Sequence, residues 1–527
     1  MITYNHNKEK RRQTVKLAFS SQIKEIDSFA INTLGIPAEI LMGRSGEAVA
    51  SAVKDVCRIG DSIVILAGKG NNGGDGYAAA CLLFSEYSVT VVDVFSEGQK
   101  TAEGKHYLNE FLSLGGKVVT IDDNALTVLI STSDVIVDAI FGTGFLGAPP
   151  ESLNNLVDLV NASTATKIAV DVPLGVNADD GSIRGKVIAA DITVSLSYLK
   201  PGLLSYPAKS YCGKVILDTI GMPNDTIESN IPFYNYLFDT EEAISHLPER
   251  EVNSSKGSFG KVLLITGSKQ YSGAGILTLE AALRGGAGYV TQIADSDEIG
   301  EYVSRFPEAL YARNLLTDGT FDINGITALS MKNSATVIGS GSLESKELSD
   351  LTEALIRSEG SPLVIDASAI NALAKYSGRE ALKSAKRRII LTPHPLELSR
   401  LLGLSVEYIQ NNRISVARSF SKEYGVILVL KGASTITTDG EVLYINSTGS
   451  SALAKAGSGD VLAGLLGSIL AYHTDPVVAT ALAVYLHGKA GDTLADSLSK
   501  FGVIPSDLPK EIAKAIREIE KSKGEKI

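Results

Sequence analysis

The 527-residue chain has no tryptophan, four methionines and three cysteines. Cys57, Cys81 and Cys212 are too few and too far apart for a disulfide scaffold or a CxxC metal or redox motif. No apolar run approaches the roughly 18 residues needed to cross a membrane, and no apolar segment directly follows the basic N-terminus. We therefore expect a cytoplasmic protein without a signal peptide or a membrane partner.

Positive charge is also in short supply. The chain has 49 Lys and Arg against 60 Asp and Glu, a net charge of −11 with a pI near 5.3. Such an acidic chain is a poor candidate for nucleic-acid binding. The GxxxxGK[ST] motif is absent as well, which disfavours a Walker-type ATPase. The ordinary apolar fraction of 44% instead predicts a globular protein, and the length predicts three to four domains or two large α/β ones.

Apolar runs alternate with helix-period segments in the first half of the chain. The runs lack strict polar alternation, which is typical of a parallel α/β sheet covered on both faces. The predicted strands are Ser62–Ala67, Val89–Phe95, Asp134–Phe141 and Thr166–Val172, with a helix at Tyr77–Tyr87.

A second α/β series follows a less regular, proline-containing stretch, and we place the domain junction between Gly221 and Asp239. The predicted strands of this series are Lys261–Thr266, Ala335–Gly339, Leu363–Ala367, Arg388–Thr392 and Gly425–Lys431. Its predicted helices are Gly273–Gly285, Gly457–Ala471, Val477–Ala490 and an amphipathic C-terminal helix from Lys510.

A glycine-rich segment, LAGKGNNGGDG, begins at Leu66 between a predicted strand and a predicted helix. Glycines there let the backbone approach a phosphate, and the N–H groups of the loop point at the anion. Asp75 at the predicted helix start either caps free N–H groups or contacts a ligand. The spacing of Gly68, Gly70 and Gly73 also matches the dinucleotide fingerprint, with Asp93 as a candidate ribose ligand.

Two aspartates, Asp138 and Asp171, follow the strand-like runs VIV and IAV. The carboxyl ends of parallel strands meet at the ligand-binding edge of the sheet, so both carboxylates should reach one site. A positioned carboxylate there can shuttle a proton.

A second glycine loop, AKAGSGDVLAG, begins at Ala454. Backbone N–H groups around Gly457 and Gly459 can converge on phosphate oxygens. Asp460 lies at the predicted helix start, where the helix dipole favours an ionised carboxylate that takes a proton from an attacking hydroxyl.

The N-terminal motifs GNNGGDG, VDAIFGTGF (from Val137) and AVDVPLGV (from Ala169) resemble those of the bifunctional NAD(P)H-hydrate repair enzymes. The resemblance implies a Rossmann-like three-layer domain at 1–222 that epimerises the R and S forms of hydrated NADH and NADPH, with Asp171 as catalytic acid/base. It implies the following hydrate-binding residues: Asn71, Asn72, Gly73, Gly74, Asp75, Gly142, Thr143, Gly144, Phe145, Leu146, Gly147, Ala148 and Asp171.

The same resemblance implies a potassium ion held by Asn72, Asp138 and position 174. Leu174 stands where the family usually has a serine, so its backbone carbonyl would have to replace the hydroxyl. Lys200 in YLKPG matches a recurrent lysine of the family; a solvated surface lysine is the alternative.

The C-terminal motifs GSGD, KGSFGK (from Lys256), LTPHPLELSRLLG (from Leu391) and LKGASTITTD (from Leu430) resemble the ribokinase-like hydrate dehydratase domain of these enzymes. This implies a three-layer α/β domain at 239–520. It would use ADP, or less favourably ATP, with Mg²⁺, to phosphorylate the hydroxyl of the S hydrate and eliminate phosphate.

In this domain the resemblance makes Asp460 the catalytic base. The implied hydrate contacts are Ala274, Gly341, His394 and Asp460, and the implied nucleotide contacts are Lys431, Gly432, Ala433, Ser434, Thr435, Gly457, Ser458 and Gly459. Asp366 is the one carboxylate that we name for Mg²⁺. For His394, a purely structural role in the turn between Pro393 and Pro395 is the alternative.

Three other functions stay open from the sequence. One is a small-molecule kinase with an appended Rossmann-like domain, and another is an NAD-dependent oxidoreductase built on the Gly68 fingerprint. The third is a non-catalytic nucleotide-binding protein. The favoured function implies small-molecule substrates and a homo-oligomer.

Overall fold

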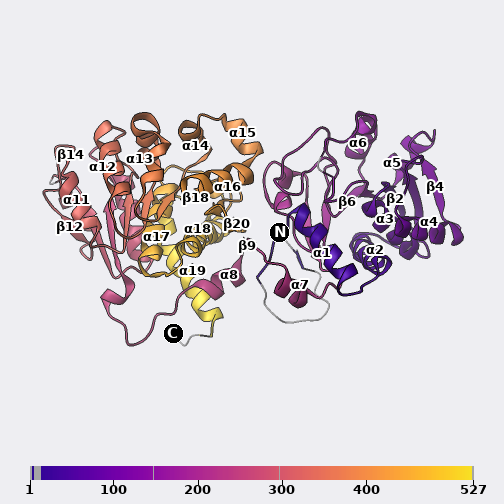
Figure 1. The fold of residues 1–527 in the computed structure, drawn as a ribbon, viewed down its shortest axis with the longest axis horizontal. Coiled ribbons are helices and arrows are strands. Elements are labelled where there is room, and N and C mark those ends of the chain that lie inside the picture. Colours follow the sequence, from indigo (N-terminus) through magenta and orange to yellow (C-terminus); the bar gives the residue numbers. More distant parts are fainter. Residues whose placement is uncertain (1–2, 5–13, 146, 296, 525–527) are drawn as a thin grey trace. The chain divides into compact units, whose positions relative to one another are not determined.

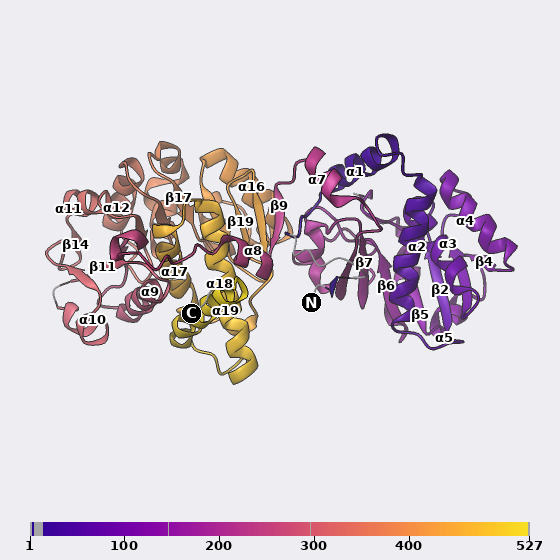
Figure 2. The ribbon, with the colours of Figure 1, turned by 90° about the horizontal axis from the view of Figure 1, so that it is seen from below.

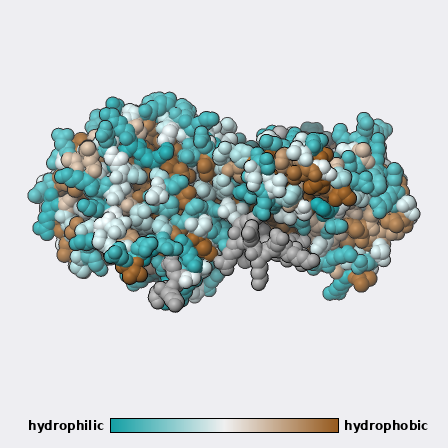
Figure 3. All heavy atoms as spheres, turned by 60° about the horizontal axis from the view of Figure 1, so that its bottom comes forward, coloured by the Kyte–Doolittle hydropathy of each residue, from teal (hydrophilic) through white to brown (hydrophobic). Residues whose placement is uncertain are grey.

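The computed structural model describes residues 3–4, 14–145, 147–295 and 297–524. Contacts divide the chain into two compact units (Figure 1), one containing Lys16–Asn235 and the other Tyr236–Ile527. We refer to them as the N-terminal and C-terminal units. In the described part of the chain, no helix is both long and apolar enough to cross a membrane. Hydrophilic and hydrophobic residues are interspersed on the face of the molecule that Figure 3 shows.

The N-terminal unit contains a parallel sheet of eight strands in the order β1-β8-β7-β6-β5-β2-β3-β4. The strands are β1 (Thr3–Tyr4), β2 (Ser62–Ala67), β3 (Ser88–Asp93), β4 (Lys117–Thr120), β5 (Val135–Ala139), β6 (Thr166–Val170), β7 (Ile192–Leu196) and β8 (Lys214–Asp218). The helices are α1 (Ser20–Asn32), α2 (Ala38–Lys54), α3 (Asn71–Leu83), α4 (Ala102–Ser113), α5 (Leu126–Thr132), α6 (Asn154–Ala162) and α7 (Asn224–Asn230).

Helices cover both faces of this sheet. Val64 and Leu66 of β2 pack into a core cluster with Leu126 of α5 and Val157 of α6. Ile65 points to the other face, where the α3 backbone comes so close that a Cβ at Gly76 would lie 3.1 Å from its side chain. The predicted three-layer α/β arrangement is therefore confirmed for this unit.

The predicted start of the helix after β2 is wrong. Helix α3 begins at Asn71 rather than Tyr77, so the glycine-rich segment forms its first turns. A Cβ at Gly68 would lie 2.0 Å from the Ile140 carbonyl oxygen, and one at Gly73 would lie 2.0 Å from the Gly68 carbonyl oxygen. These glycines therefore permit a close packing of strand, turn and helix, which local helix propensity does not reveal.

The C-terminal unit contains a ten-stranded sheet in the order β12-β11-β10-β15-β16-β17-β18-β19-β20-β9, and a separate hairpin of β13 and β14. The strands are β9 (Asn235–Phe238), β10 (Lys261–Ile265), β11 (Tyr289–Ile293), β12 (Leu310–Ala312), β13 (Leu316–Thr317), β14 (Thr320–Phe321), β15 (Ala335–Ile338), β16 (Leu363–Ile365), β17 (Ile389–Leu391), β18 (Ile427–Leu430), β19 (Ile436–Thr438) and β20 (Leu443–Asn446). Within this sheet, β12, β11, β10, β15, β16, β17 and β18 pair in parallel, whereas β19 pairs antiparallel with both β18 and β20. The sequence did not predict this antiparallel part.

Helices again flank the sheet (Figure 2). The helices are α8 (Thr240–His246), α9 (Ser272–Arg284), α10 (Ile299–Arg305), α11 (Ile323–Ser330), α12 (Lys346–Arg357), α13 (Ala367–Ala372), α14 (Pro395–Leu402), α15 (Val406–Asn411), α16 (Arg413–Tyr424), α17 (Ser458–Tyr472), α18 (Pro476–Leu498) and α19 (Leu508–Ser522). Val262 and Leu264 of β10 pack in one core with Leu279 of α9 and Leu465 of α17. Helix α17 therefore lies directly on the sheet, and its N-terminus is anchored by this packing.

Candidate active sites

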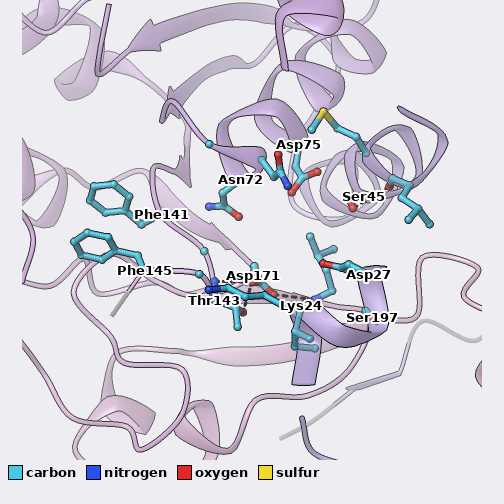
Figure 4. A pocket seen from close by; sticks show the side chains of 18 of the residues that line it. Lys24, Asp27, Ser45, Asn72, Asp75, Phe141, Thr143, Phe145, Asp171 and Ser197 are labelled. Atoms are coloured by element: carbon cyan, nitrogen blue, oxygen red, sulfur yellow. Dashed lines mark hydrogen bonds between the residues drawn. The ribbon is translucent and has the colours of Figure 1, made fainter. Parts of the chain in front are cut away.

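A cavity of about 480 Å³ opens at the carboxyl ends of the strands of the N-terminal unit (Figure 4). Its wall comes from α1, α2, the start of α3, one residue of α4, and the segments that follow β5, β6, β7 and β8. The predicted residues that line it are Asn71, Asn72, Asp75, Gly142, Thr143, Gly144, Phe145 and Asp171. Gly73, Gly74, Gly147 and Ala148 are not among the lining residues, and Leu146 lies outside the described residues.

Asp171 directly follows β6, and its carboxylate is held from several sides. Its Oδ2 accepts hydrogen bonds from the Thr143 backbone N–H, at 2.9 Å, and from the Thr143 hydroxyl. Its Oδ1 contacts the Lys200 ammonium group. Burial raises the pKa of Asp171, but Lys200 and the Thr143 hydrogen bonds outweigh it and hold the pKa below its usual range. The carboxylate is therefore ionised at neutral pH.

Lys200 is not a surface residue. Its side chain is 1% exposed, and its ammonium group also donates to the Leu196 carbonyl at 2.6 Å. The alternative of a solvated lysine is therefore wrong. The signal in the sequence was the YLKPG motif alone, because nothing local shows that the chain folds Lys200 against Asp171.

The side of the cavity facing Asp171 carries Asp75, Asn72 and Ser45 (Figure 4). Asp75 lies inside α3 and is 8% exposed, so it does not cap the helix start as one prediction had it. Burial, together with the negative charges of Asp171 and Asp27, raises the pKa of Asp75 well above its usual range. The Ser45 hydroxyl donates to the Leu41 carbonyl at 3.1 Å. A hydrogen bond with Ser45 and the charge of Lys200 lower the pKa of Asp75 but do not cancel the rise. One cavity thus holds one carboxyl group whose pKa is lowered, Asp171, and one whose pKa is raised, Asp75.

Asp27 of α1 is a third carboxyl group that lines this cavity, and the sequence reasoning missed it. Burial raises the pKa of Asp27 to about 6, with Lys200 lowering it and Asp171 raising it. Nothing in the local sequence SSQIKEIDSF distinguishes Asp27 from the polar face of an amphipathic helix. Asp93, by contrast, pairs with Lys100 at 2.7 Å and is not among the lining residues.

Two of the three residues predicted to hold potassium, Asp138 and Leu174, are hydrogen-bonded to each other. Asp138 lies within β5, and its Oδ2 accepts from the Leu174 N–H at 2.7 Å. Burial raises the pKa of Asp138 to about 6. The Leu174 side chain is in the core, so only its backbone carbonyl can serve an ion, and that carbonyl accepts from the Ile188 N–H at 3.1 Å. The carboxylate, the Asn72 amide oxygen and this carbonyl are hard oxygen donors of the kind that alkali cations take.

In the C-terminal unit, predicted residues meet at the carboxyl ends of β16 and β18. Lys431 follows β18 and Asp366 follows β16, and the Lys431 ammonium group lies 3.1 Å from Asp366 Oδ1. The same ammonium group lies 3.8 Å from Glu397 Oε2. The Asp366 carboxylate is fixed further by the hydroxyls of Ser340, at 2.8 Å, and Thr392, at 2.6 Å. Asp366 is therefore already well supplied with donors.

Asp460 lies in the first turn of α17, after Gly457, which has a φ of +100°. Burial and the negative charge of Asp366 raise the pKa of Asp460 to about 7, although Lys431 lowers it. A Cβ at Gly459 would lie 3.5 Å from the Lys431 ammonium nitrogen, so the GSGD turn and Lys431 face each other. A base with a pKa near neutrality beside a cation suits proton removal from a hydroxyl.

The remaining predicted residues of this unit occupy neighbouring loops. Lys431, Gly432, Ala433, Ser434 and Thr435 form the β18–β19 connection. A Cβ at Gly341 would lie 2.5 Å from the Ala274 Cβ, so these two predicted hydrate contacts adjoin. His394 is the N-cap of α14: its Nδ1 accepts from the N–H groups of Leu396 and Glu397, both at 3.2 Å.

Two buried residues that the sequence reasoning missed support these loops. Arg413 donates to the backbone carbonyls of Leu430, at 3.0 Å, and Lys431, at 3.2 Å. His487 of α18 lies 3.2 Å from the Ser458 hydroxyl through Nε2, and burial lowers the pKa of His487 to about 4, so the ring is neutral. Both are far from their partners in sequence, which is why no motif indicated them. Among the described residues, no group of three or more His, Cys, Asp or Glu is placed to hold a metal ion.

The fold and these two sites define a two-domain α/β enzyme with a glycine-rich turn at the start of a helix in each domain. Residues 38–202 match the family model described as YjeF-related protein N-terminus, and residues 262–516 match the model described as NAD(P)H-hydrate dehydratase. The chain is 32% identical over 519 residues to the bifunctional NAD(P)H-hydrate repair enzyme Nnr of Moorella thermoacetica, covering 96% of this chain and 97% of the relative. The Escherichia coli enzyme of the same name is 32% identical over 494 residues, covering 93% of this chain and 92% of the relative.

The chain therefore belongs to the family of bifunctional NAD(P)H-hydrate repair enzymes. Among solved structures, the ADP/ATP-dependent NAD(P)H-hydrate dehydratase of Bacillus subtilis, co-crystallised with ATP and Mg²⁺, is 28% identical with a TM-score of 0.48. The match covers 55% of the present chain and 99% of the Bacillus subtilis chain.

Proposed function

We propose that this chain repairs hydrated NADH and NADPH in two reactions. The N-terminal unit interconverts the R and S hydrates, and the C-terminal unit converts the S hydrate back to the dinucleotide at the expense of ADP, with ATP less favoured. The single observation that carries the proposal is the pairing, in one chain of this family, of an Asp171 cavity with an Asp460 glycine turn. The domains would be 1–222 and 239–520, as the motifs imply.

In the proposed epimerisation, Asp75 and Asp171 act from facing sides of the cavity. Asp75, protonated, gives its proton to the departing hydroxyl as the ring nitrogen lone pair forms a C=N bond. Water then adds to the other face of the ring and gives a proton to the ionised Asp171. The hydroxyl is thereby replaced with inverted configuration. Asp75 has lost one proton and Asp171 has gained one, and proton exchange with solvent returns both carboxyl groups to their starting states. Such acid–base assistance contributes roughly 10²–10⁴-fold.

In the proposed dehydration, the hydroxyl oxygen of the substrate attacks the terminal phosphorus of the nucleotide, and Asp460 takes the proton of that hydroxyl. N–H groups around Gly457, Ser458 and Gly459 would donate hydrogen bonds to the phosphate oxygens on which negative charge develops. Lys431, already facing Asp366 and Gly459, would meet the phosphates as a point charge. The nucleotide leaves with one phosphate fewer, as AMP from ADP or as ADP from ATP. The lone pair of the ring nitrogen then expels the phosphate, and the adjacent ring carbon loses a proton to solvent, which restores the dihydronicotinamide.

Two ions belong to the proposal. Asp138, Asn72 and the Leu174 carbonyl would hold potassium, whose charge would favour the ionised form of the buried Asp138 carboxyl. Magnesium would arrive with the nucleotide, because Asp366 is occupied by Lys431, Ser340 and Thr392. We also propose a homo-oligomer, which light scattering of the purified chain would check.

The test is recovery of near-ultraviolet absorbance from a mixture of R and S NADH hydrates, with Mg²⁺ and ADP or ATP. Recovery of the whole mixture, faster than the hydrates interconvert unaided, supports both reactions. Recovery of the S fraction alone contradicts the epimerase. A stable phosphorylated product without recovery would instead favour a small-molecule kinase.

A further inference from the structure

Three residues that follow neighbouring strands of the N-terminal sheet have left-handed backbone although none is glycine. Asp171, Ser197 and Ile220 follow β6, β7 and β8, with φ of 66°, 66° and 47°. All three line the cavity. Left-handed backbone is unfavourable for a non-glycine residue, and such residues cluster at sites where a functional side chain is needed.

Ser197 is the one among them with an unexplained polar group. The residue is 4% exposed, and its hydroxyl has no hydrogen-bond partner among the described residues. Figure 4 shows its side chain at the cavity wall, near Asp27. A buried hydroxyl without a partner carries a desolvation cost, and glycine at this position would avoid both that cost and the backbone strain. These two costs indicate that the Ser197 hydroxyl has a function other than stabilising the fold.

We infer that the Ser197 hydroxyl hydrogen-bonds the hydroxyl group of the hydrated nicotinamide ring in the epimerase site. This inference rests on the proposed function. A hydroxyl both donates and accepts, so in the epimer whose hydroxyl lies on the Asp171 side it can donate to the Asp171 carboxylate and accept from Ser197. Because Asp171 and Ser197 follow adjacent strands β6 and β7, the two groups flank one place in the cavity. Ser197 would orient the hydroxyl on the Asp171 side of the ring, the one that forms as water adds to that face.

Asn72 gives a second, independent indication that this cavity binds a polar ligand. Its side-chain nitrogen is also buried and has no partner among the described residues, and Asn72 lies on the side opposite Asp171 (Figure 4). A donor on one side and a hydroxyl on the other suit a small ring with polar substituents at both ends. A cavity that only packed side chains together would not leave both groups unsatisfied.

The experiment compares Ser197→Gly with Ser197→Ala in the full chain. Both remove the hydroxyl, but only glycine relieves the left-handed backbone. We expect both variants to lose epimerase kcat/KM by about 3–10-fold. Glycine should raise the Tm of the N-terminal unit by about 2–4 °C, whereas alanine should not. The dehydratase rate on pure S hydrate serves as the matched control and should not change in either variant.

A second measurement separates contact with the substrate hydroxyl from general damage to the cavity. NADH lacks the added hydroxyl, so its inhibition constant for the epimerase should be the same in wild type and variants, while the KM for the hydrate rises. Full kcat/KM in both variants, or an equal change for NADH, would overturn the inference. Absence of epimerase activity in the wild-type chain would instead count against the proposed function.

Discussion

The ammonium group of Lys200 contacts the carboxylate of Asp171 inside the N-terminal cavity, where the Lys200 side chain is 1% exposed. The pair is completed by the Leu196 carbonyl on the lysine and by Thr143 on the aspartate. A buried ion pair with this many hydrogen bonds keeps Asp171 ionised, which the proposed role as proton acceptor requires.

Replacing Lys200 with Met should raise the pKa of Asp171, because the cation that lowers it is gone. The acid limb of the epimerase pH profile should then move to higher pH, and activity at pH 7 should fall by at least about tenfold. Leaving one buried charge unpaired should also cost about 3–5 kcal/mol. A depressed carboxyl pKa stabilises the fold above the pKa of the unfolded chain, so wild type and variant should converge as the pH falls. Lys200→Arg keeps the charge, and an equal shift of the profile in that control would contradict the account.

Asp75 must be protonated in the proposed epimerisation, so activity should decline as the pH rises through its raised pKa. Asp75→Asn should lower kcat by roughly 10²–10⁴-fold with a smaller change in KM. Asp27→Asn removes a negative charge that raises the pKa of Asp75, so the basic limb should move to lower pH. Stopped-flow epimerisation assays over a pH series measure both. Retention of wild-type kcat by Asp75→Asn would remove it from the mechanism.

Asp460 has a pKa of about 7, so dehydratase activity should rise with pH around neutrality as the carboxylate forms. Asp460→Asn should slow the nucleotide-dependent recovery of NADH by roughly 10²–10⁴-fold and leave epimerisation intact. A raised carboxyl pKa means that wild-type stability is lost as pH rises from the unfolded pKa through about 7. The variant should therefore be the more stable protein at pH 8, by about 1–3 kcal/mol in denaturant titrations. A variant equally stable at pH 5 and pH 8 relative to wild type would show that Asp460 titrates normally.

Substitution of two glycines of the first loop by alanine should affect the stability of the N-terminal unit differently. A Cβ at Gly73 would lie 2.0 Å from the Gly68 carbonyl oxygen, whereas one at Gly70 meets nothing within 4 Å. Gly73→Ala should destabilise the N-terminal unit by about 1–3 kcal/mol and impair epimerisation. Gly70→Ala, a matched control for stability at an exposed position without positive φ, should leave the stability of the unit unchanged. Equal melting temperatures for the two variants would refute the packing role of Gly73.

Potassium dependence tests the remaining ion site. If Asp138, Asn72 and the Leu174 carbonyl hold potassium, epimerisation should be faster in KCl than in NaCl at equal ionic strength. Asp138→Asn should remove the difference, because it removes the only formal charge of the site. Dehydration measured in parallel reports any effect of the two salts on the C-terminal unit.

The sequence by itself determined the α/β class, the position of most parallel strands and the two glycine turns. Strands such as Ser62–Ala67 are buried on both faces, so their apolar runs are visible without context. The family membership followed from the same ordered motifs, and Asp171 and Asp460 were named from them.

Only the tertiary structure decided which residues surround those aspartates. The ionisation of Asp171 depends on Lys200, and that of Asp75 on Asp27 and Asp171, through contacts between segments that are distant in sequence. The early start of α3 depends on how closely Gly68 approaches the Ile140 carbonyl. Burial, long-range charge and backbone strain, as at Ser197, arise only when the strand ends come together at one edge of the sheet, so no local pattern encodes them.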